Sequence, residues 1–256
     1  MAYDSIYRLC RIHSCTVLNE SYSMLEIIDD EIAGRCEPGN FVEIKPYKAG
    51  SVLKRLFKPI SIYKVESDSI FLMIKALGRG SKELTKLNEG DMVELIAPLG
   101  NSFPMPNGKS IALVSGGIGY PPLWFLKSRL NADIKVRWFH GGACEKDIFP
   151  CDEAWTIDGS AGTKGLVTQG LVEWLKDHPC DAIYSCGPEA LLKALAALCD
   201  THNIPLYVSM EAYMACGVGV CHGCTVPIGT KENWNYLRVC KDGPVFDARD
   251  IRWELI

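Results

Sequence analysis

The chain has 256 residues, of which 48% are hydrophobic and 23% charged, enough for one large domain or two to three small ones with buried cores. Its formal net charge of −4 at pH 7 argues against a nucleic-acid-binding protein that depends on broad electrostatic attraction. No apolar run approaches the ~18 residues of a membrane span and the N-terminus lacks the apolar core of a signal peptide, so we expect a cytoplasmic protein.

Residues 1–105 carry short β-type runs separated by Gly, Pro and Asn. The expected strands are residues 23–28, 40–46, 59–65, 69–77 and 91–100. Apolar and polar residues alternate in FVEIK and MVELI, and no long helical pattern interrupts the runs. Several short strands at this spacing predict an antiparallel β-barrel domain.

Residues 106–206 change to strands that alternate with helices. The expected strands are residues 110–115, 133–142, 155–160 and 181–186, and the expected helices are residues 123–131, 168–178 and 187–205. This alternation predicts a doubly wound α/β domain with a parallel sheet. Residues 207–256 show little regular periodicity and form the third expected part, a small C-terminal domain.

That last segment holds the most specific pattern in the sequence, four clustered cysteines. They are Cys216, Cys221, Cys224 and Cys240. Four and then two residues separate the first three, and fifteen more precede the fourth, a spacing typical of plant-type 2Fe–2S clusters. Glycines in such a loop let backbone N–H groups approach the sulfurs, and here they are Gly217, Gly219 and Gly223.

Zinc is the main alternative metal, and the residues alone leave it open. Cys221 and Cys224 have the spacing of one zinc-binding pair, but Cys240 stands alone and the loop is richer in glycine than a zinc site needs. His222 lies between two ligands and is expected at the surface. The other eight of the twelve cysteines are dispersed, and we expect most of them to be small buried residues.

Two strand ends in the α/β segment have the composition of a dinucleotide site. Gly116, Gly117 and Gly119 lie between an expected strand and a helix, where N–H groups and the helix dipole can hold a pyrophosphate. This is not the G-x-G-x-x-G fingerprint, and a simple tight connection explains it equally well. At the second strand end, Cys186 precedes a helix opened by Gly187 and Pro188, and ligands of parallel sheets bind at such carboxyl ends.

The barrel segment offers a third candidate site. Six basic residues and no acid lie between positions 45 and 64, namely Lys45, Lys48, Lys54, Arg55, Lys58 and Lys64. They indicate an anion site, a partner surface or a solvated hairpin. Downstream, the segment KALGRGSKEL contains a second glycine turn at Gly80, with Ser81 at an expected helix cap. Together these segments suit a phosphate-bearing cofactor.

The order of these motifs resembles the ferredoxin–NAD(P) reductase superfamily. KPISI, GRGS, PLGNSF, SGGIGYPPL and SCGPE carry the resemblance, and CGVGVCHGC with CKDGPVFDA is similar to the electron-transfer subunits of NAD-linked dihydroorotate dehydrogenases. The resemblance covers nearly the whole chain. It implies a barrel that binds FAD, an α/β domain that binds a pyridine nucleotide, and a 2Fe–2S domain ligated by the four cysteines.

The resemblance also implies site residues. FAD would be held by Lys58, Pro59, Ile60, Ser61, Ile62, Lys75, Leu77, Gly80 and Ser81. The nucleotide would be held by Gly116, Gly117, Gly119, Gly187 and Pro188, with Cys186 as a catalytic residue. Lys58 stands where the family usually has arginine, so it keeps the charge but loses the bidentate fork, and Arg55 is the alternative contact. Tyr120 and Pro121 replace a smaller pair beside the nicotinamide path.

The implied function is electron transfer in pyrimidine biosynthesis between NAD(H), FAD, the cluster and a partner. The resemblance implies an FMN-containing catalytic subunit as partner, in a heterotetramer of two of each, and Trp234 and Tyr236 are candidate docking anchors. Two alternatives remain. The chain could be a subunit of a ferredoxin:NAD(P) reductase or hydrogenase-type complex, or a redox sensor without enzymatic activity. The sequence does not decide whether the chain uses NAD or NADP, although Asp158 would favour NAD if it lies near the ribose.

Overall fold

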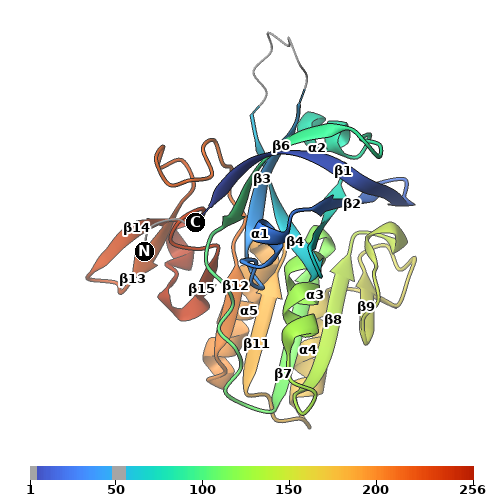
Figure 1. The fold of residues 1–256 in the computed structure, drawn as a ribbon. Coiled ribbons are helices and arrows are strands. Elements are labelled where there is room, and N and C mark those ends of the chain that lie inside the picture. The colour runs from blue at the N-terminus through green and yellow to red at the C-terminus, as the bar shows by residue number, and fades with distance from the viewer. Residues whose placement is uncertain (1–4, 48–55) are drawn as a thin grey trace.

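The structure, a computed structural model, describes residues 5–47 and 56–256. Its N-terminal part is a closed antiparallel barrel with strand order β1-β2-β5-β4-β3-β6 (Figure 1). The strands are β1 (Ile6–Asn19), β2 (Tyr22–Ile28), β3 (Phe41–Pro46), β4 (Lys58–Glu66), β5 (Ser69–Lys75) and β6 (Met92–Leu99). The expected barrel is confirmed, and the sequence predicts every strand of it except β1.

Alternation along the strands decides which side chains fill the barrel. Val42 and Ile44 on β3, and Ile62 on β4, are fully buried in the barrel core, whereas Phe41 belongs to a different hydrophobic cluster outside it. This two-residue period is the geometry of a strand with one face turned inward. Two short helices, α1 (Asp30–Ala33) and α2 (Arg79–Leu84), lie in the connections between strands.

The second part is a seven-stranded sheet with order β10-β9-β8-β7-β11-β12-β15. Its strands are β7 (Ser110–Gly116), β8 (Lys135–Gly142), β9 (Glu153–Thr156), β10 (Thr163–Lys164), β11 (Ala182–Cys186), β12 (Leu206–Ser209) and β15 (Val245–Asp247). All neighbouring pairs are parallel except β12 with β15. The expected doubly wound α/β architecture is therefore confirmed.

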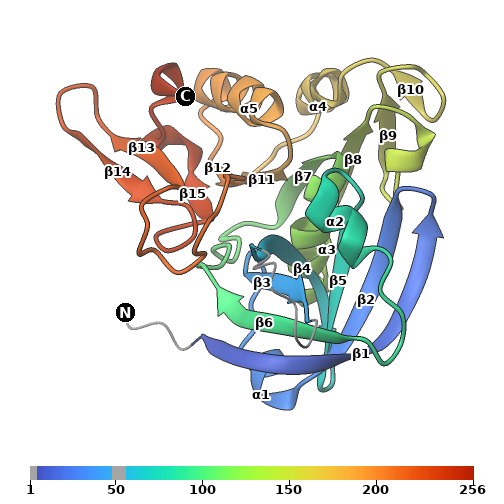
Figure 2. The same ribbon diagram turned by 90° about the horizontal axis from the view of Figure 1, so that it is seen from above.

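Helices cover both faces of this sheet. They are α3 (Tyr120–Arg129), α4 (Val167–Leu175) and α5 (Glu189–His202). Figure 2 shows α4 and α5 on one face and α3 on the other, between the sheet and the barrel. Tyr120 at the start of α3 is fully buried and stacks on Trp138, with 4.4 Å between ring centroids. It therefore lies in the core between barrel and sheet and lines neither of the two cavities described below.

The C-terminal part consists of the cysteine loop and a hairpin of β13 (Thr225–Gly229) and β14 (Trp234–Arg238). β15 then returns to pair with β12, so the expected boundary near residue 207 falls inside β12. The division into residues 1–105, 106–206 and 207–256 stays a prediction for independent folding units. Within the described ranges, no helix is long and apolar enough to cross a membrane.

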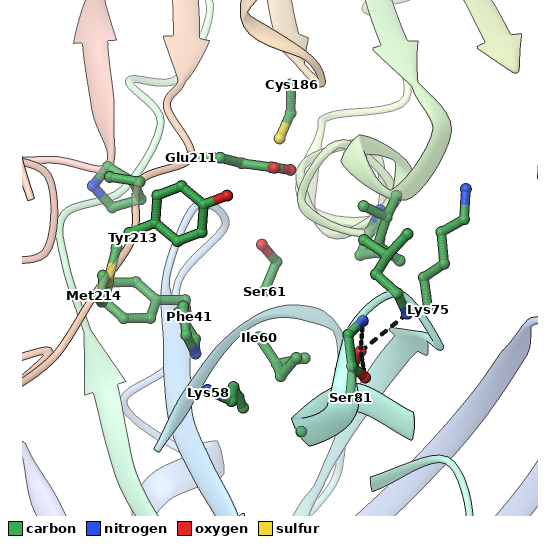
Figure 3. A pocket seen from close by; sticks show the side chains of 18 of the residues that line it. Phe41, Lys58, Ile60, Ser61, Lys75, Ser81, Cys186, Glu211, Tyr213 and Met214 are labelled. Carbon is green, nitrogen blue, oxygen red and sulfur yellow. Dashed lines mark hydrogen bonds between the residues drawn. The ribbon is translucent and has the colours of Figure 1, made fainter. Parts of the chain in front are cut away.

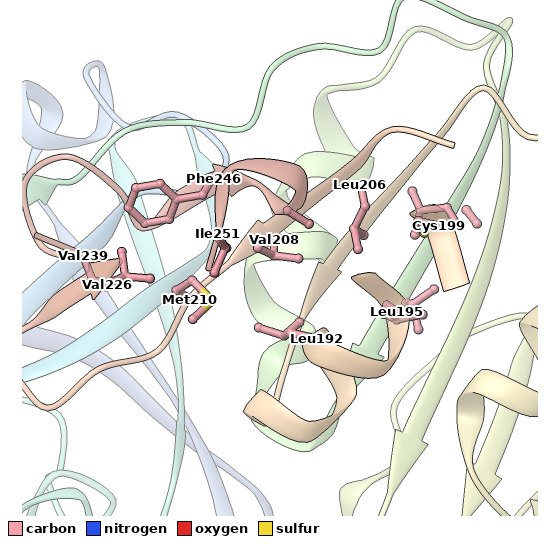
Figure 4. Close-up of a cluster of buried hydrophobic side chains, with 14 of the residues drawn as sticks. Leu192, Leu195, Cys199, Leu206, Val208, Met210, Val226, Val239, Phe246 and Ile251 are labelled. Carbon is pink, nitrogen blue, oxygen red and sulfur yellow. The ribbon is translucent and has the colours of Figure 1, made fainter. Parts of the chain in front are cut away.

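A continuous hydrophobic cluster joins this C-terminal part to the sheet. Figure 4 shows Val208 and Met210, at the end of β12, close to Ile251 and Phe246 of the tail. Val226 and Val239, both at the open end of the hairpin, belong to the same cluster, as do the buried cysteines Cys224 and Cys240 beside them. The cysteine loop is therefore anchored on the edge of the α/β sheet by apolar packing.

Candidate cofactor sites

A cavity of about 480 Å³ opens between the barrel, the ends of the sheet strands and the segment before the cysteine loop. Its lining includes most residues that the resemblance assigns to FAD, namely Lys58, Pro59, Ile60, Ser61, Lys75, Leu77, Gly80 and Ser81. The side chain of Ile62 faces the barrel core instead, so only its backbone is available to a cofactor. Arg55 and its neighbours Lys48 and Lys54 lie outside the described residues.

The side chain of Ser81 closes the turn before α2. The hydroxyl oxygen of Ser81 accepts hydrogen bonds from the backbone N–H groups of Leu77 (2.9 Å) and Gly78 (3.0 Å). Ser81 is thus the third residue of the helix and folds back on the turn, rather than occupying the expected cap position itself. Lys58 crosses the same turn, because a Cβ at Gly80 would lie 2.2 Å from its Cε atom.

The cavity also contains Ser61, Cys186 and Glu211, which Figure 3 shows pointing toward one region. Cys186 is 2% exposed, and burial raises the pKa of its thiol far above the usual range, with a further increase from the charge of Glu211. The thiol therefore stays protonated. Glu211 is an exposed residue that lines the cavity, and desolvation by the surrounding protein raises the pKa of its carboxyl.

A second cavity of about 590 Å³ lies at the carboxyl ends of the sheet strands. It is lined by Gly116, Gly117 and Pro188, as predicted, together with Gly141, Gly142, Trp155 and Ile157 from neighbouring strand ends. Gly119 and Gly187 do not line it. Lys75, Leu77, Ile118 and Glu211 line both cavities, so the two are contiguous.

The predicted glycines bring the two strand ends into contact. A Cβ at Gly119 would lie 2.1 Å from the carbonyl oxygen of Cys186, and one at Gly187 would lie 2.9 Å from the backbone nitrogen of Gly116. Only glycine permits this approach. Gly117 has a positive φ of 52° with no atom within 4 Å of a built Cβ, so its backbone faces the open cavity.

A charged cluster fastens the barrel to the sheet where the cavities meet. Lys75 on β5 forms an ion pair with Asp147 (2.5 Å), and the hydroxyl of Tyr22 on β2 donates to the same carboxylate oxygen (2.7 Å). Burial disfavours the carboxylate, but the hydrogen bonds from Lys75 and Tyr22 outweigh it and lower the pKa of Asp147. This arrangement fixes the relative position of the two cavities.

Backbone N–H groups surround the sulfurs of the cysteine loop. The N–H of Gly219 donates to Cys240 (3.1 Å), that of Cys240 to Cys224 (3.4 Å) and that of Cys221 to Cys216 (3.5 Å). Gly217 and Gly219 have positive φ values of 65° and 79°, which lets the loop turn its N–H groups inward. Such donors stabilise thiolate and sulfide charge.

The four thiols form two pairs. Cys216 interacts with Cys221, and Cys224 interacts with Cys240. Among the described residues, no three His, Cys, Asp or Glu side chains are placed to hold one metal ion. Cys216 also acts electrostatically on Cys240, so the two pairs belong to one group of interacting thiols, as the ligands of a single dinuclear centre would. Burial opposes the Cys216 thiolate, but hydrogen bonds led by the Cys221 N–H lower its pKa to about 6.

Sequence reasoning missed Glu211 and Asp147. Glu211 directly follows Met210 after β12, the strand beside β11, so the rule that ligands bind at carboxyl ends of parallel strands was a usable signal. The sequence hides this signal, because residues 207–256 show little regular periodicity and β12 is not recognised there as a strand of the sheet. Trp234 and Tyr236 are 40% and 54% exposed, outside the hydrophobic clusters.

Comparison with known proteins identifies the same families. Residues 211–252 match the family model of the iron–sulfur cluster binding domain of dihydroorotate dehydrogenase B. A Listeria monocytogenes protein named dihydroorotate dehydrogenase B (NAD(+)), electron transfer subunit, is 35% identical over 240 residues, covering 88% of this chain and 91% of the relative. A Bacillus mycoides protein of the same name is 37% identical over 84% of this chain and 86% of its own length.

Solved structures agree on the fold. The NADH-dependent reduced ferredoxin-NADP oxidoreductase, from work on flavin-based electron bifurcation, superimposes with a TM-score of 0.82 at 23% identity, covering 97% of this chain and 91% of that one. A ferredoxin NADP+ reductase from Neisseria gonorrhoeae with bound FAD and NADP has a TM-score of 0.60 at 16% identity, covering 76% and 91%. The expected family and fold class are confirmed: the chain belongs to the electron transfer subunits of dihydroorotate dehydrogenase B (NAD(+)).

Proposed function

We propose that this chain carries electrons between a catalytic partner subunit that oxidises dihydroorotate and NAD(H). The barrel cavity would hold FAD, the α/β cavity would take NAD(H) as substrate, and the four cysteines would ligate a 2Fe–2S cluster. The proposal follows the names of the relatives and the iron–sulfur family model.

One observation carries it: the three candidate sites are adjacent in space, with the barrel cavity between the other two. Glu211 and Lys75 line both cavities, so ligands in them would be in contact. Tyr213 and Met214, which line the barrel cavity on its other side, lie within three residues of Cys216. A flavin, which exchanges two electrons with a nicotinamide and one with an iron–sulfur cluster, belongs in the middle of such a series.

The residues of the chain then have separate tasks. Lys58 and the N–H groups of the Gly80–Ser81 turn would bind the FAD diphosphate. Gly116 and Gly117 would leave room for the nucleotide backbone, and the α5 N-terminus behind Pro188 would face its phosphates. Ser61 and the protonated thiol of Cys186 would lie beside the contact between the flavin ring and the nicotinamide ring. Both are neutral hydrogen-bond donors, so they add no charge there. The Lys75–Asp147 ion pair would hold the two binding sites in register.

The cofactor of the partner subunit and the stoichiometry of the complex are further parts of the proposal. The name of the relatives implies a catalytic subunit. We propose that this subunit contains FMN and that the complex is a heterotetramer with two copies of each chain. Since the two contiguous cavities and the cysteine loop are assigned to FAD, NAD(H) and the cluster, we place the dihydroorotate site on the partner subunit.

Anaerobic purification of the chain, alone and with its copurifying partner, tests the proposal. We expect one FAD and about two iron and two sulfide per chain, flavin bleaching by NADH, and orotate formation only with the partner present. Native mass spectrometry of the complex gives the cofactors and the stoichiometry. Zinc in place of iron, or orotate formation by the isolated chain, would refute the assignment. A copurifying hydrogenase or ferredoxin-reducing subunit would replace the partner but keep the cofactors.

A further inference from the structure

Glu43 lies between the barrel cavity and the cysteine loop. It is on β3, between Val42 and Ile44, whose side chains fill the barrel core. Its own side chain therefore points to the outer face of the strand, as does that of Phe41, which lines the barrel cavity. Across the ladder, Glu43 is in register with Pro59, another residue of that cavity.

The carboxylate lies directly against the cysteine loop. A Cβ built at Gly217 would be 2.3 Å from the Cγ atom of Glu43 and 2.6 Å from its Oε1 oxygen. Gly217 follows the first cluster cysteine, so a side chain at this position would displace either the loop or Glu43. The close approach and the positive φ of 65° together require glycine here.

Neither oxygen of this carboxylate has a hydrogen-bond partner among the described residues, although Glu43 is completely buried. Buried polar groups are nearly always paired, and an unpaired buried carboxylate is strongly unfavourable. A chain that kept this group for packing alone would be more stable with an apolar residue. Its presence between two redox sites therefore points to an electrostatic role.

Charges on both sides of Glu43 fit such a role. Lys58, opposite Ile44 on the neighbouring strand, attracts the carboxylate, and Cys216 on the cluster side repels it. Ile96 beside it on β6 and Val218 in the loop pack against the hydrophobic cluster, so little solvent is available to screen the charge. Reduction of a cluster adds a negative charge, which a nearby unscreened carboxylate opposes.

We propose that Glu43 is a positioning residue that supplies an unpaired buried negative charge beneath the cysteine loop, lowers the reduction potential of the cluster, and links it electrostatically through Lys58 to the flavin site. The inference rests on the proposed 2Fe–2S cluster. A lower potential favours passage of an electron from the cluster to the flavin over its retention on the cluster.

The test is a redox titration of the cluster in the whole chain with its cofactors. The chain is reduced stepwise with dithionite and the cluster is followed by electron paramagnetic resonance at about pH 8.5, above the pKa of about 7 that burial gives Glu43. In Glu43→Gln the equilibrium constant for cluster reduction should increase about tenfold. Iron content and the line shape of the signal should not change.

Two variants serve as controls. Glu43→Asp keeps the charge and should retain the low potential. Glu94→Gln removes a carboxylate from the adjacent strand β6, but one already bonded to Lys45 (3.1 Å) and Tyr7 (2.9 Å), and should leave the potential unchanged. An unchanged potential in Glu43→Gln overturns the inference, and so does loss of the cluster from that variant, because the side chain would then serve to hold the loop. Absence of iron from the unmodified chain would instead refute the proposed function.

Discussion

The side chain of Lys58 lies across the backbone of Gly80, so that a Cβ at Gly80 would come within 2.2 Å of Cε and 3.1 Å of Cδ of the lysine. The two residues come from different strands and turns of the barrel, and both line its cavity. The lysine stem needs the space that the missing side chain leaves. Glycine at this position therefore sets where the ammonium group of Lys58 can be placed.

Gly80→Ala should accordingly weaken FAD binding. The added methyl group displaces the Lys58 stem and withdraws its charge from the diphosphate site, with an expected loss of about tenfold in affinity. Fluorescence of released FAD during dialysis measures this. Lys82→Ala, on the same short helix α2 but outside the cavity lining, is the control and should bind FAD as the unmodified chain does. Equal affinities in both variants would contradict the interpretation.

Lys58→Ala should weaken FAD binding further, because it removes a charge-assisted phosphate contact worth about 1.5–3 kcal/mol. Lys58→Arg should retain or improve affinity, since it restores the bidentate donor usual in the family. Combining Lys58→Ala with Gly80→Ala should add little, as both changes act through the same ammonium group. If FAD affinity is unchanged in Lys58→Ala, Arg55 becomes the candidate for this contact.

Local patterns in the sequence predict most of the fold. Alternation identifies β3 and β6, and buried apolar runs identify β7 and β11, because each strand's burial follows from its own residues. β1 is missed since only Cys10 and Ile12 along its fourteen residues are buried, which leaves a mostly polar pattern. β15 is missed because its pairing with β12 joins segments more than thirty residues apart, which no local pattern encodes.

The residues of the candidate sites also fall into two groups, those with a local sequence signal and those without one. The cysteine spacing and the glycine turns are local signals, and the structure brings the corresponding residues together. Glu43 and Glu211 have no local signal of function, because their importance arises from burial and from cavities built by several elements. Sequence reasoning finds residues whose chemistry requires a particular spacing, and it misses those whose chemistry comes from tertiary surroundings.

Asp158→Asn should shift the nucleotide preference toward NADPH. Asp158 follows Ile157, which lines the α/β cavity, and hydrogen bonds from the hydroxyl and N–H of Ser160 lower the pKa of its carboxyl. A charged carboxylate there repels a 2′-phosphate, so its removal should raise the NADPH-to-NADH ratio of flavin reduction rates roughly tenfold. Asp133→Asn, before the amino end of β8, is the control. An unchanged ratio would place the ribose away from Asp158.

His140 should make the chain less stable in mild acid. It is completely buried, and desolvation lowers its pKa from 6.5 to about 4, although hydrogen bonds with Asp147 and Ser115 oppose the shift. The folded state therefore excludes a proton that the unfolded chain binds. Stability is retained above pH 6.5 and declines as pH falls toward 4, by about 3 kcal/mol in total.

Urea unfolding followed by tryptophan fluorescence across this pH range measures the effect of His140. In His140→Gln the dependence of the free energy of unfolding on pH should be flatter between pH 6.5 and 4. His13→Gln is the matched control, because His13 is an exposed side chain on β1, and its curve should follow that of the unmodified chain. Parallel curves for all three proteins would exclude His140 as the titrating group.

Docking of the catalytic subunit should depend on the tip of the cysteine loop. Val220 is 78% exposed and precedes Cys221, the most exposed of the four proposed ligands, so this is where the cluster approaches the surface. Val220→Asn should lower coupled orotate formation about threefold to tenfold by wetting an apolar contact, while NADH reduction of an artificial acceptor stays unchanged. Val17→Asn, at a 70% exposed valine on the barrel, controls for the loss of an exposed apolar side chain.

Trp234→Ala distinguishes docking by the loop from docking by the hairpin. Trp234 pairs with Gly229 at the end of the hairpin that is far from Cys224 and Cys240. If Trp234→Ala lowers coupled orotate formation more than Val220→Asn does, the catalytic subunit docks on the hairpin and the loop is excluded.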